Sequence, residues 1–159
     1  MSESCFICNR IEMIKAGTNN TFVAELETGY AVIGDNQFFR GYSLFLCKID
    51  VHELHELEPE FRTKFLVEMA QVAEAACKAF KPVKMNYELL GNTDHHLHWH
   101  LFPRYADDPR PLGPIWSIDE AITYAESTKP TKEELEVLKG ELLAELEKTA
   151  KIVRRFSDV

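Results

Sequence analysis

The chain carries the sequence HHLHWHLFPR at residues 95–104, and this stretch holds four of its six histidines. From His96 to Leu101, histidine alternates with apolar residues. Alternation with a period of two predicts a strand, because successive side chains of a strand point to opposite faces of a sheet. We therefore expect His96, His98 and His100 to share one face, with neighbours about 7 Å apart. The apolar residues between them should face a core.

Three imidazoles on one face of a sheet are unfavourable if they serve only to pack the protein interior. Each ring has a donor and an acceptor to satisfy, and each can become charged near neutral pH. A histidine-rich strand face in water is the simplest explanation. A single metal ion fits poorly, since neighbours about 7 Å apart cannot all reach one Zn²⁺ with bonds near 2.1 Å. A neutral imidazole is also a nucleophile that can accept a phosphoryl or nucleotidyl group. The pattern favours this last chemistry.

The elements around the histidine run follow from hydrophobic periodicity and turn residues. Their order along the chain is a helix, a group of strands, a helix, a second group of strands and then helices. This order predicts an α+β fold with an antiparallel sheet. One long helix should pack on that sheet, and two capping boxes should open the helices nearer the C-terminus. The expected strands are residues 22–26, 30–33, 43–47, 83–90 and 96–102, and the expected helices are 5–16, 59–80, a short one opened by residues 117–120, and 131 to about 156.

Composition limits the function classes. A chain of 159 residues that is 45% hydrophobic and 28% charged predicts one globular domain. Its net charge of −8 disfavours sequence-independent binding of nucleic acids. No apolar run approaches the roughly 18 residues of a membrane helix. The segment Met1–Cys5 does not resemble a secretory signal, and four cysteines are too sparse for a disulfide framework. A cytoplasmic protein with reduced thiols is expected.

The segment His96-Leu97-His98-Trp99-His100-Leu101-Phe102 resembles the His-φ-His-φ-His-φ-φ signature of the histidine triad (HIT) superfamily, where φ is apolar. The Pro103-Arg104 pair, an N-terminal Cys-x-x-Cys and the order of strands and helix before the triad also resemble that family. The resemblance implies a HIT-like domain over residues 1–105. Residues 106–159 would be a C-terminal extension, with a Pro-rich segment and a long helix packed on the same domain.

The resemblance implies a nucleotide hydrolase or nucleotidyl transferase. Such enzymes cleave at the α-phosphate of a nucleotide conjugate, for example a dinucleoside polyphosphate or a phosphoramidate, and need no cofactor for catalysis. His98 matches the family's nucleophile, which forms a nucleotidyl-histidine intermediate. His100 would hydrogen-bond the phosphoryl oxygens, and His96 would support the site. Tyr42 stands where many members have histidine, and its hydroxyl can hydrogen-bond toward the triad. The family also implies a homodimer.

Further residues resemble the family's nucleotide-binding positions. Asn92 lies where many members have a glutamine that reaches a phosphate or bridging oxygen. Asn86 resembles an asparagine that contacts the ligand, and Asp35 an acidic residue that binds ribose hydroxyls. Phe6 and Ile7 resemble the apolar wall over the base, although packing in the core is an equally good interpretation of both.

A structural zinc site is a further expectation. Cys5-x-x-Cys8 alone is a weak signal, but with His96 it supplies three ligands of a closed tetrahedral site. In zinc-containing branches of the family a histidine stands at the position of Asp50, whose carboxylate can also bind zinc. His52 is a second candidate for the fourth ligand. The alternative is that the cysteines only pack at the start of a helix.

Two other classes of function stay open on the sequence alone. One is a nucleotide-binding or protein-interaction module that keeps the fold without turnover, and the other is a zinc-stabilised structural domain. The intact triad argues against the silent module, because loss of the middle histidine would be the simplest way to lose activity. Metal analysis separates the zinc-stabilised domain from an enzyme only if the triad proves inert.

Overall fold

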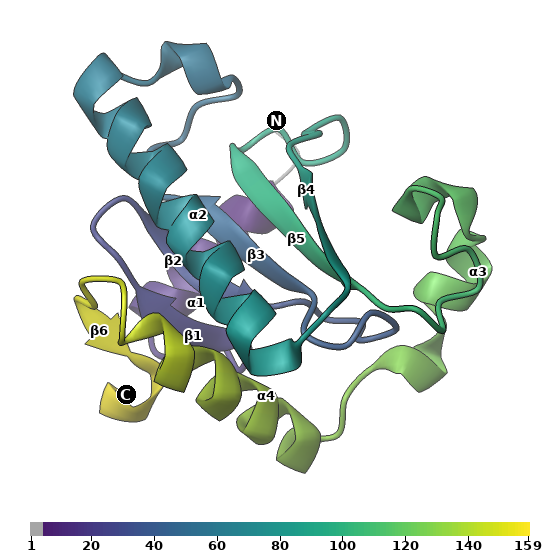
Figure 1. Cartoon of the computed structure of the whole chain (residues 1–159). Helices are drawn as coiled ribbons and strands as arrows, with labels where there is room; N and C mark the ends of the chain where they lie inside the picture. Colours follow the sequence, from purple (N-terminus) through teal and green to yellow (C-terminus); the bar gives the residue numbers. More distant parts are fainter. Residues whose placement is uncertain (1–4) are drawn as a thin grey trace.

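A computed structural model describes residues 5–159, so the expectation about a signal at the very start of the chain lies mostly outside the described residues. The fold is α+β, with one six-stranded antiparallel sheet in the order β4-β5-β3-β2-β1-β6 (Figure 1). Short 3₁₀ turns connect several elements. The helices are α1 (Phe6–Lys15), α2 (Pro59–Phe80), α3 (Glu120–Thr123) and α4 (Lys132–Leu146), and the strands are β1 (Phe22–Glu25), β2 (Gly29–Ile33), β3 (Ser43–Cys47), β4 (Lys84–Glu88), β5 (His98–Arg104) and β6 (Arg154–Arg155).

Helices α2 and α4 lie side by side over one face of the sheet (Figure 1). The main core lies between them and the strands, where the rings of Phe45 and Phe65 stack with their centroids 5.2 Å apart. Leu97 and Leu101 are buried in this core, as the alternation predicted, and Trp99 packs against it. The even-numbered residues of β5 therefore face the opposite side of the sheet.

Helix α1 covers that opposite side. Its buried isoleucines Ile7, Ile11 and Ile14 pack on apolar residues of β1, β2 and β3. The Cys5 thiol accepts a weak hydrogen bond from the Cys8 backbone N–H at 3.5 Å, which caps the first turn of the helix. The Cys-x-x-Cys motif therefore lies at the start of α1, with Cys5 as its N-cap.

A buried carboxylate joins the long helix to the first hairpin. Glu68 of α2 accepts hydrogen bonds from the backbone N–H of Glu27 (3.1 Å) and of Thr28 (2.8 Å), and from the Thr28 hydroxyl. These bonds satisfy donors that the turn between β1 and β2 would otherwise bury unpaired. The helix begins at Pro59 and ends where Lys81 adopts a left-handed conformation (φ 52°) before Pro82.

The C-terminal helix is shorter than the sequence pattern predicts. The capping box at Thr131 and Glu134 is present, but α4 ends at Leu146 instead of continuing to about Phe156. The β-branched pair Ile152-Val153 favours extended backbone. The Val153 N–H donates to the Glu25 carbonyl at 2.8 Å, and β6 then pairs with β1. Pairing of this otherwise open sheet edge outweighs the helical pattern.

The segment between β5 and α4 also differs from expectation. The short helix α3 is capped by Asp119, whose side chain accepts from the Ala121 N–H at 2.9 Å, and not by a box starting at Ser117. The Pro-rich loop before it is held by the buried Arg104. The guanidinium of Arg104 donates to the Asp108 carboxylate at 2.7 Å and to the Gly113 carbonyl at 2.8 Å. Among residues 5–159, no helix is long and apolar enough to cross a membrane.

Candidate active site

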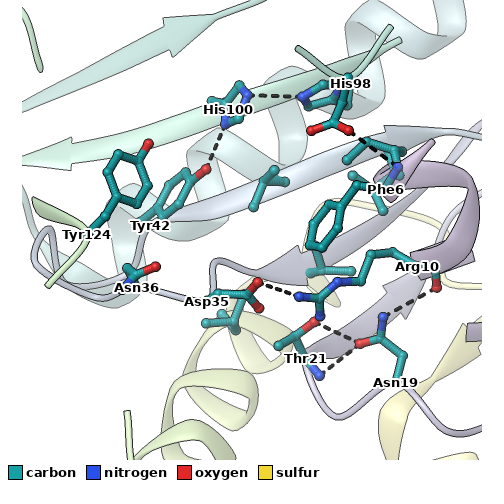
Figure 2. Close-up of a pocket in the computed structure, with 16 residues that line it drawn as sticks. Phe6, Arg10, Asn19, Thr21, Asp35, Asn36, Tyr42, His98, His100 and Tyr124 are labelled. Atoms are coloured by element: carbon teal, nitrogen blue, oxygen red, sulfur yellow. Dashed lines mark hydrogen bonds and ion pairs between the residues drawn. The ribbon is translucent and has the colours of Figure 1, made fainter. Parts of the chain in front are cut away.

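Two histidines of β5 and one tyrosine form a hydrogen-bonded row on the α1 side of the sheet. The Nδ1 atom of His98 lies 2.6 Å from the His96 carbonyl oxygen, and its Nε2 atom lies 3.0 Å from Nε2 of His100. The Nδ1 atom of His100 lies 2.6 Å from the Tyr42 hydroxyl. Figure 2 shows the His98–His100–Tyr42 contacts along one wall of a cavity.

The hydrogen bonds assign the proton positions along this row. A carbonyl oxygen only accepts, so Nδ1 of His98 carries its proton and Nε2 of a neutral His98 holds the lone pair. Nε2–H of His100 then donates to that lone pair, and Nδ1 of His100 accepts from the Tyr42 hydroxyl. The result is a neutral row in which Nε2 of His98 carries no proton and accepts the hydrogen bond from His100.

Burial keeps all three groups in this neutral state. Burial lowers the pKa of His98, an effect partly opposed by the His96 carbonyl. Burial, followed by the neighbouring His98, lowers the pKa of His100 to about 4. Burial also raises the pKa of Tyr42 well above its usual value, so the phenol remains a donor. At neutral pH both imidazoles of the row are therefore uncharged, and a neutral imidazole can act as a nucleophile.

His96 does not extend the row as the sequence predicted. Strand β5 begins at His98, two residues later than expected, and the His96 ring contacts other partners. Its Nε2 atom lies 2.7 Å from the Cys47 carbonyl oxygen. The regular pairing of β3 with β5 ends at His98. The Leu97 N–H donates to the Val51 carbonyl instead, so His96 lies outside the ladder. The backbone carbonyl of His96, rather than its ring, orients His98.

The His96 ring instead completes a cluster with the Cys-x-x-Cys motif. Ligand atoms of Cys5, Cys8 and His96 all lie within 4.8 Å of one another. Because Nε2 of His96 donates to the Cys47 carbonyl, Nδ1 is free to bind a metal, and it lies 3.3 Å from the Cys8 sulfur. An oxygen of Asp50 lies 3.2 Å from the same Nδ1 atom. Two thiols, an imidazole and a carboxylate fit the donor set of a structural zinc site.

The electrostatics of this cluster depend on the state of its thiols. Burial, together with a hydrogen bond from the Cys8 thiol to Cys5, raises the pKa of Cys8 to about 12. A metal ion would reverse this by binding the thiolate. His52, the second candidate for the fourth ligand, lies near His95 instead, with their ring centroids 5.3 Å apart.

The cavity beside the histidine row has a volume of about 290 Å³ and is lined by residues of α1, the sheet and the loop after β2. Phe6 is 47% exposed and forms one wall, whereas Ile7 is buried beneath it. The guanidinium of Arg10 stacks on the Phe6 ring at 4.6 Å and forms an ion pair with Asp35. Figure 2 shows this pair across the cavity from His98 and His100.

The structure brings some predicted nucleotide-binding residues together and separates others. Phe6, Ile7, Asp35 and Tyr42 line the cavity with His98 and His100. Two asparagines do not. Asn86 lies on β4 opposite Phe102 and accepts a hydrogen bond from Arg104 at 2.9 Å, and Asn92 is exposed in the turn before β5.

Several lining residues were not predicted from the sequence. Asp94, two residues after Asn92, reaches the cavity and accepts from the Phe6 N–H at 3.3 Å. Arg10 follows Phe6 by one helical turn, a spacing that the sequence does contain. Apolar residues of β2 and β3 also line the cavity. The other unpredicted lining residues come from loops and from the segment after β5, and no local pattern marks them: Asn19, Thr21, Asn36 and Tyr124.

The fold and the site together define an α+β protein in which a β-strand presents two linked imidazoles to an apolar-walled cavity. The model of the HIT domain matches residues 16–107, more than half of the chain. The chain therefore belongs to the HIT family.

Individual relatives are distant. The chain is 25% identical over 134 residues to Protein hit of Bacillus subtilis (strain 168), which covers 81% of this chain and 86% of that protein. The crystal structure of a histidine triad protein from Marinobacter aquaeolei VT8 superposes with a TM-score of 0.66 at 24% identity, covering 87% of this chain and 96% of that one. A Zn-bound histidine triad family protein from Mycobacterium smegmatis has a TM-score of 0.64 at 21% identity, covering 93% and 96%. These structures share the fold.

Proposed function

We propose that the protein is a nucleotide hydrolase or nucleotidyl transferase that acts through a nucleotidyl-His98 intermediate at the α-phosphate of a nucleotide conjugate. The observation that carries the proposal is the hydrogen bond from Nδ1 of His98 to the His96 carbonyl at 2.6 Å. This bond leaves the lone pair on Nε2. That nitrogen lies next to His100, and both histidines line the cavity.

The reaction proceeds in two displacements. Nε2 of His98 forms a bond to the α-phosphorus, and the bond to the leaving group breaks with its electron pair remaining on that group. The new imidazolium keeps its Nδ1 proton on the His96 carbonyl. The substrate replaces His98 as the acceptor for Nε2–H of His100, which turns to the phosphoryl oxygens. Water, or an acceptor in a transferase, then attacks the phosphorus, and the bond from phosphorus to Nε2 breaks with its electron pair returning to His98. The attacking group loses its proton to solvent, and the departed leaving group takes one up.

The remaining cavity would hold the nucleoside. Asp35 lines the cavity, and a carboxylate can accept hydrogen bonds from two vicinal ribose hydroxyls. In the ligand-free site Arg10 pairs with Asp35. Arg10 would therefore have to share that carboxylate with the ribose, while the exposed ring of Phe6 would stack on the base.

A structural zinc ion is part of the proposal. Cys5, Cys8, His96 and Asp50 would hold it, and the ion would stabilise the contact between the start of α1 and the segments around β3 and β5. The Zn-bound relative from Mycobacterium smegmatis supports this assignment. The nucleophile is an imidazole, so catalysis itself would not need the metal.

A screen with purified protein tests the activity. Diadenosine polyphosphates, adenosine phosphoramidate and nucleotide sugars are incubated with the wild-type protein and with the His98→Asn variant, and nucleotide release is measured by chromatography. We expect release with the wild type alone. A wild-type protein that binds nucleotides but releases none from any substrate would favour the catalytically silent binding module instead.

A further inference from the structure

A second cavity, of about 160 Å³, adjoins the first on the side of His100. The two cavities share His100, Tyr42, Tyr124 and Asn36 in their walls, and Figure 2 shows these four residues grouped at one end of the first cavity. The rest of the second cavity is lined by Phe39, by β4 and Leu90 after it, by β5 and by residues 115–124. The segment 115–124 lies beyond the residues that the HIT domain model matches. A group bound here would sit beside the reacting phosphate.

An unpartnered carboxylate faces this second cavity. Glu88 is only 8% exposed and lies directly opposite His100 in the pairing of β4 with β5. In the part of the chain that the structure describes, no hydrogen bond or ion pair reaches its side chain. The nearby Arg104 donates to Asp108 and Asn86 instead. Burial raises the pKa of Glu88, while Arg104 opposes that shift. A cation bound in the cavity would offset the cost of burying this charge.

The other walls also suit an organic cation. Glu120, in the exposed first turn of α3, adds a second carboxylate. Trp116 lines the cavity and is 70% exposed, so its ring face is open to a ligand, whereas the lining rings of Phe39 and Phe102 are buried. Carboxylates and the faces of aromatic rings both attract an ammonium group. No lysine or arginine of residues 5–159 lines the cavity, so it offers no positive charge to a phosphate.

We propose that the second cavity binds the leaving group of the nucleotide conjugate and selects an organic cation, an ammonium on a short apolar chain, over a polyphosphate. The inference rests on the proposed function, because the cavity borders the wall of the active site formed by His100. A polyphosphate in the same place would bring several negative charges next to Glu88 and Glu120, which would repel it.

Equilibrium binding to the His98→Asn variant tests the proposal without turnover. Four probes are compared: AMP, its phosphoramidates with butylamine and with 1,4-diaminobutane, and diadenosine tetraphosphate. The two phosphoramidates differ only in the terminal ammonium. We expect the diaminobutane conjugate to bind about tenfold more tightly than the butylamine conjugate, the size of one hydrogen bond to a charged group. Diadenosine tetraphosphate should bind no more tightly than AMP.

Substitutions assign the preference to the cavity. In the His98→Asn background, Glu88→Gln should abolish the tenfold difference between the two phosphoramidates. Glu120→Lys changes an exposed residue that can be replaced without disturbing the core, and it should weaken the diaminobutane conjugate while strengthening diadenosine tetraphosphate. Glu74→Lys, a matched charge reversal on the exposed face of α2, should change neither.

The outcomes separate the two proposals. Equal affinities for the two phosphoramidates, or a preference that survives both Glu88→Gln and Glu120→Lys, would overturn the cation-binding subsite while leaving the proposed function intact. Failure to bind AMP itself would overturn the proposed function, and the subsite with it.

Discussion

The Nδ1 atom of His98 lies 2.6 Å from the carbonyl oxygen of His96, the residue that the sequence pattern treats as an equal member of the triad. The two histidines thus contribute different groups to this contact: His98 its imidazole ring and His96 its backbone carbonyl. The His96 ring is occupied with Cys47, Cys8 and Asp50. We therefore expect substitutions of His96 to affect stability through the cysteine cluster, and substitutions of His98 to affect chemistry.

Replacing His98 should abolish turnover. His98→Ala and His98→Asn remove the nitrogen that forms the covalent bond, and His100 cannot substitute for it because its Nε2 atom carries the donated proton in this arrangement. We expect kcat to fall by at least about four orders of magnitude, with circular dichroism and nucleotide affinity close to wild type. A variant that keeps near-wild-type kcat on the best substrate would refute the mechanism.

Tyr42→Phe tests the proton arrangement of the row. The change deletes the hydroxyl that donates to Nδ1 of His100 at 2.6 Å and preserves the ring, which stacks on Phe102 with a centroid distance of 4.2 Å. His100 can then adopt the other tautomer, which has no donor toward the substrate. We expect kcat to fall about tenfold, the worth of one hydrogen bond, with KM nearly unchanged.

The control for that variant is Tyr105→Phe. The Tyr105 hydroxyl donates to the Arg40 carbonyl at 2.6 Å, and Tyr105 lines neither cavity. An equal loss of kcat in both variants would show that the effect is general destabilisation and not loss of the Tyr42–His100 hydrogen bond.

Much of the fold could be predicted because its signals are local. The period of α2, the stop at Lys81-Pro82 and the alternation around His98 are all contained within short windows of sequence. The C-terminal segment could not be predicted in this way. Its extended course depends on the hydrogen bond from Val153 to Glu25, which are distant in sequence, and no window includes both.

The site residues likewise separate into those with a local sequence signal and those placed by contacts between distant segments. The alternation of residues 96–101 correctly places His98 and His100 on one face, and Tyr42 reaches them as predicted. Asn86 does not line this cavity, and its side-chain oxygen accepts from the buried Arg104, a contact that its position in the sequence does not reveal. Tyr124 reaches the cavity only through the path of the loop after β5, and its neighbours in sequence give no sign of this.

The metal proposal predicts about one equivalent of zinc per chain in purified protein. Cys8→Ser should release the zinc and lower the melting temperature, whereas Cys77→Ser, which changes a cysteine of α2 outside the cluster, should not. Asp50→His should slow zinc loss to a chelator, because it supplies a second imidazole. Metal analysis and thermal melts measure these effects. Metal-free protein with unchanged stability would leave the cysteines as packing at the start of α1.

The buried state of His100 predicts a loss of stability in acid. Burial and the neighbouring His98 lower its pKa to about 4, against about 6.5 in an unfolded chain. Between these values the unfolded chain binds a proton that the folded site does not, so stability falls as the pH decreases. From pH 7 to 4.5 the loss from this residue should be on the order of 2 kcal/mol. Urea unfolding of the wild type and of His100→Gln measures it, and equal losses in both would contradict the prediction.

The same electrostatics predict the pH dependence of catalysis. His98 must be neutral to attack, and burial lowers its pKa below the ordinary histidine value. The acidic limb of kcat/KM, which reports the free enzyme, should therefore lie no higher than about pH 6.5. A bound phosphate stabilises a nearby cation, so the limb of kcat should lie at higher pH than the limb of kcat/KM. Because His98 and His100 are hydrogen-bonded, both limbs report the titration of the pair.

The test is to measure both pH profiles on one substrate whose chemical step is rate-limiting. A kcat/KM limb well above pH 7, or a kcat limb at lower pH than the kcat/KM limb, would contradict a neutral buried nucleophile.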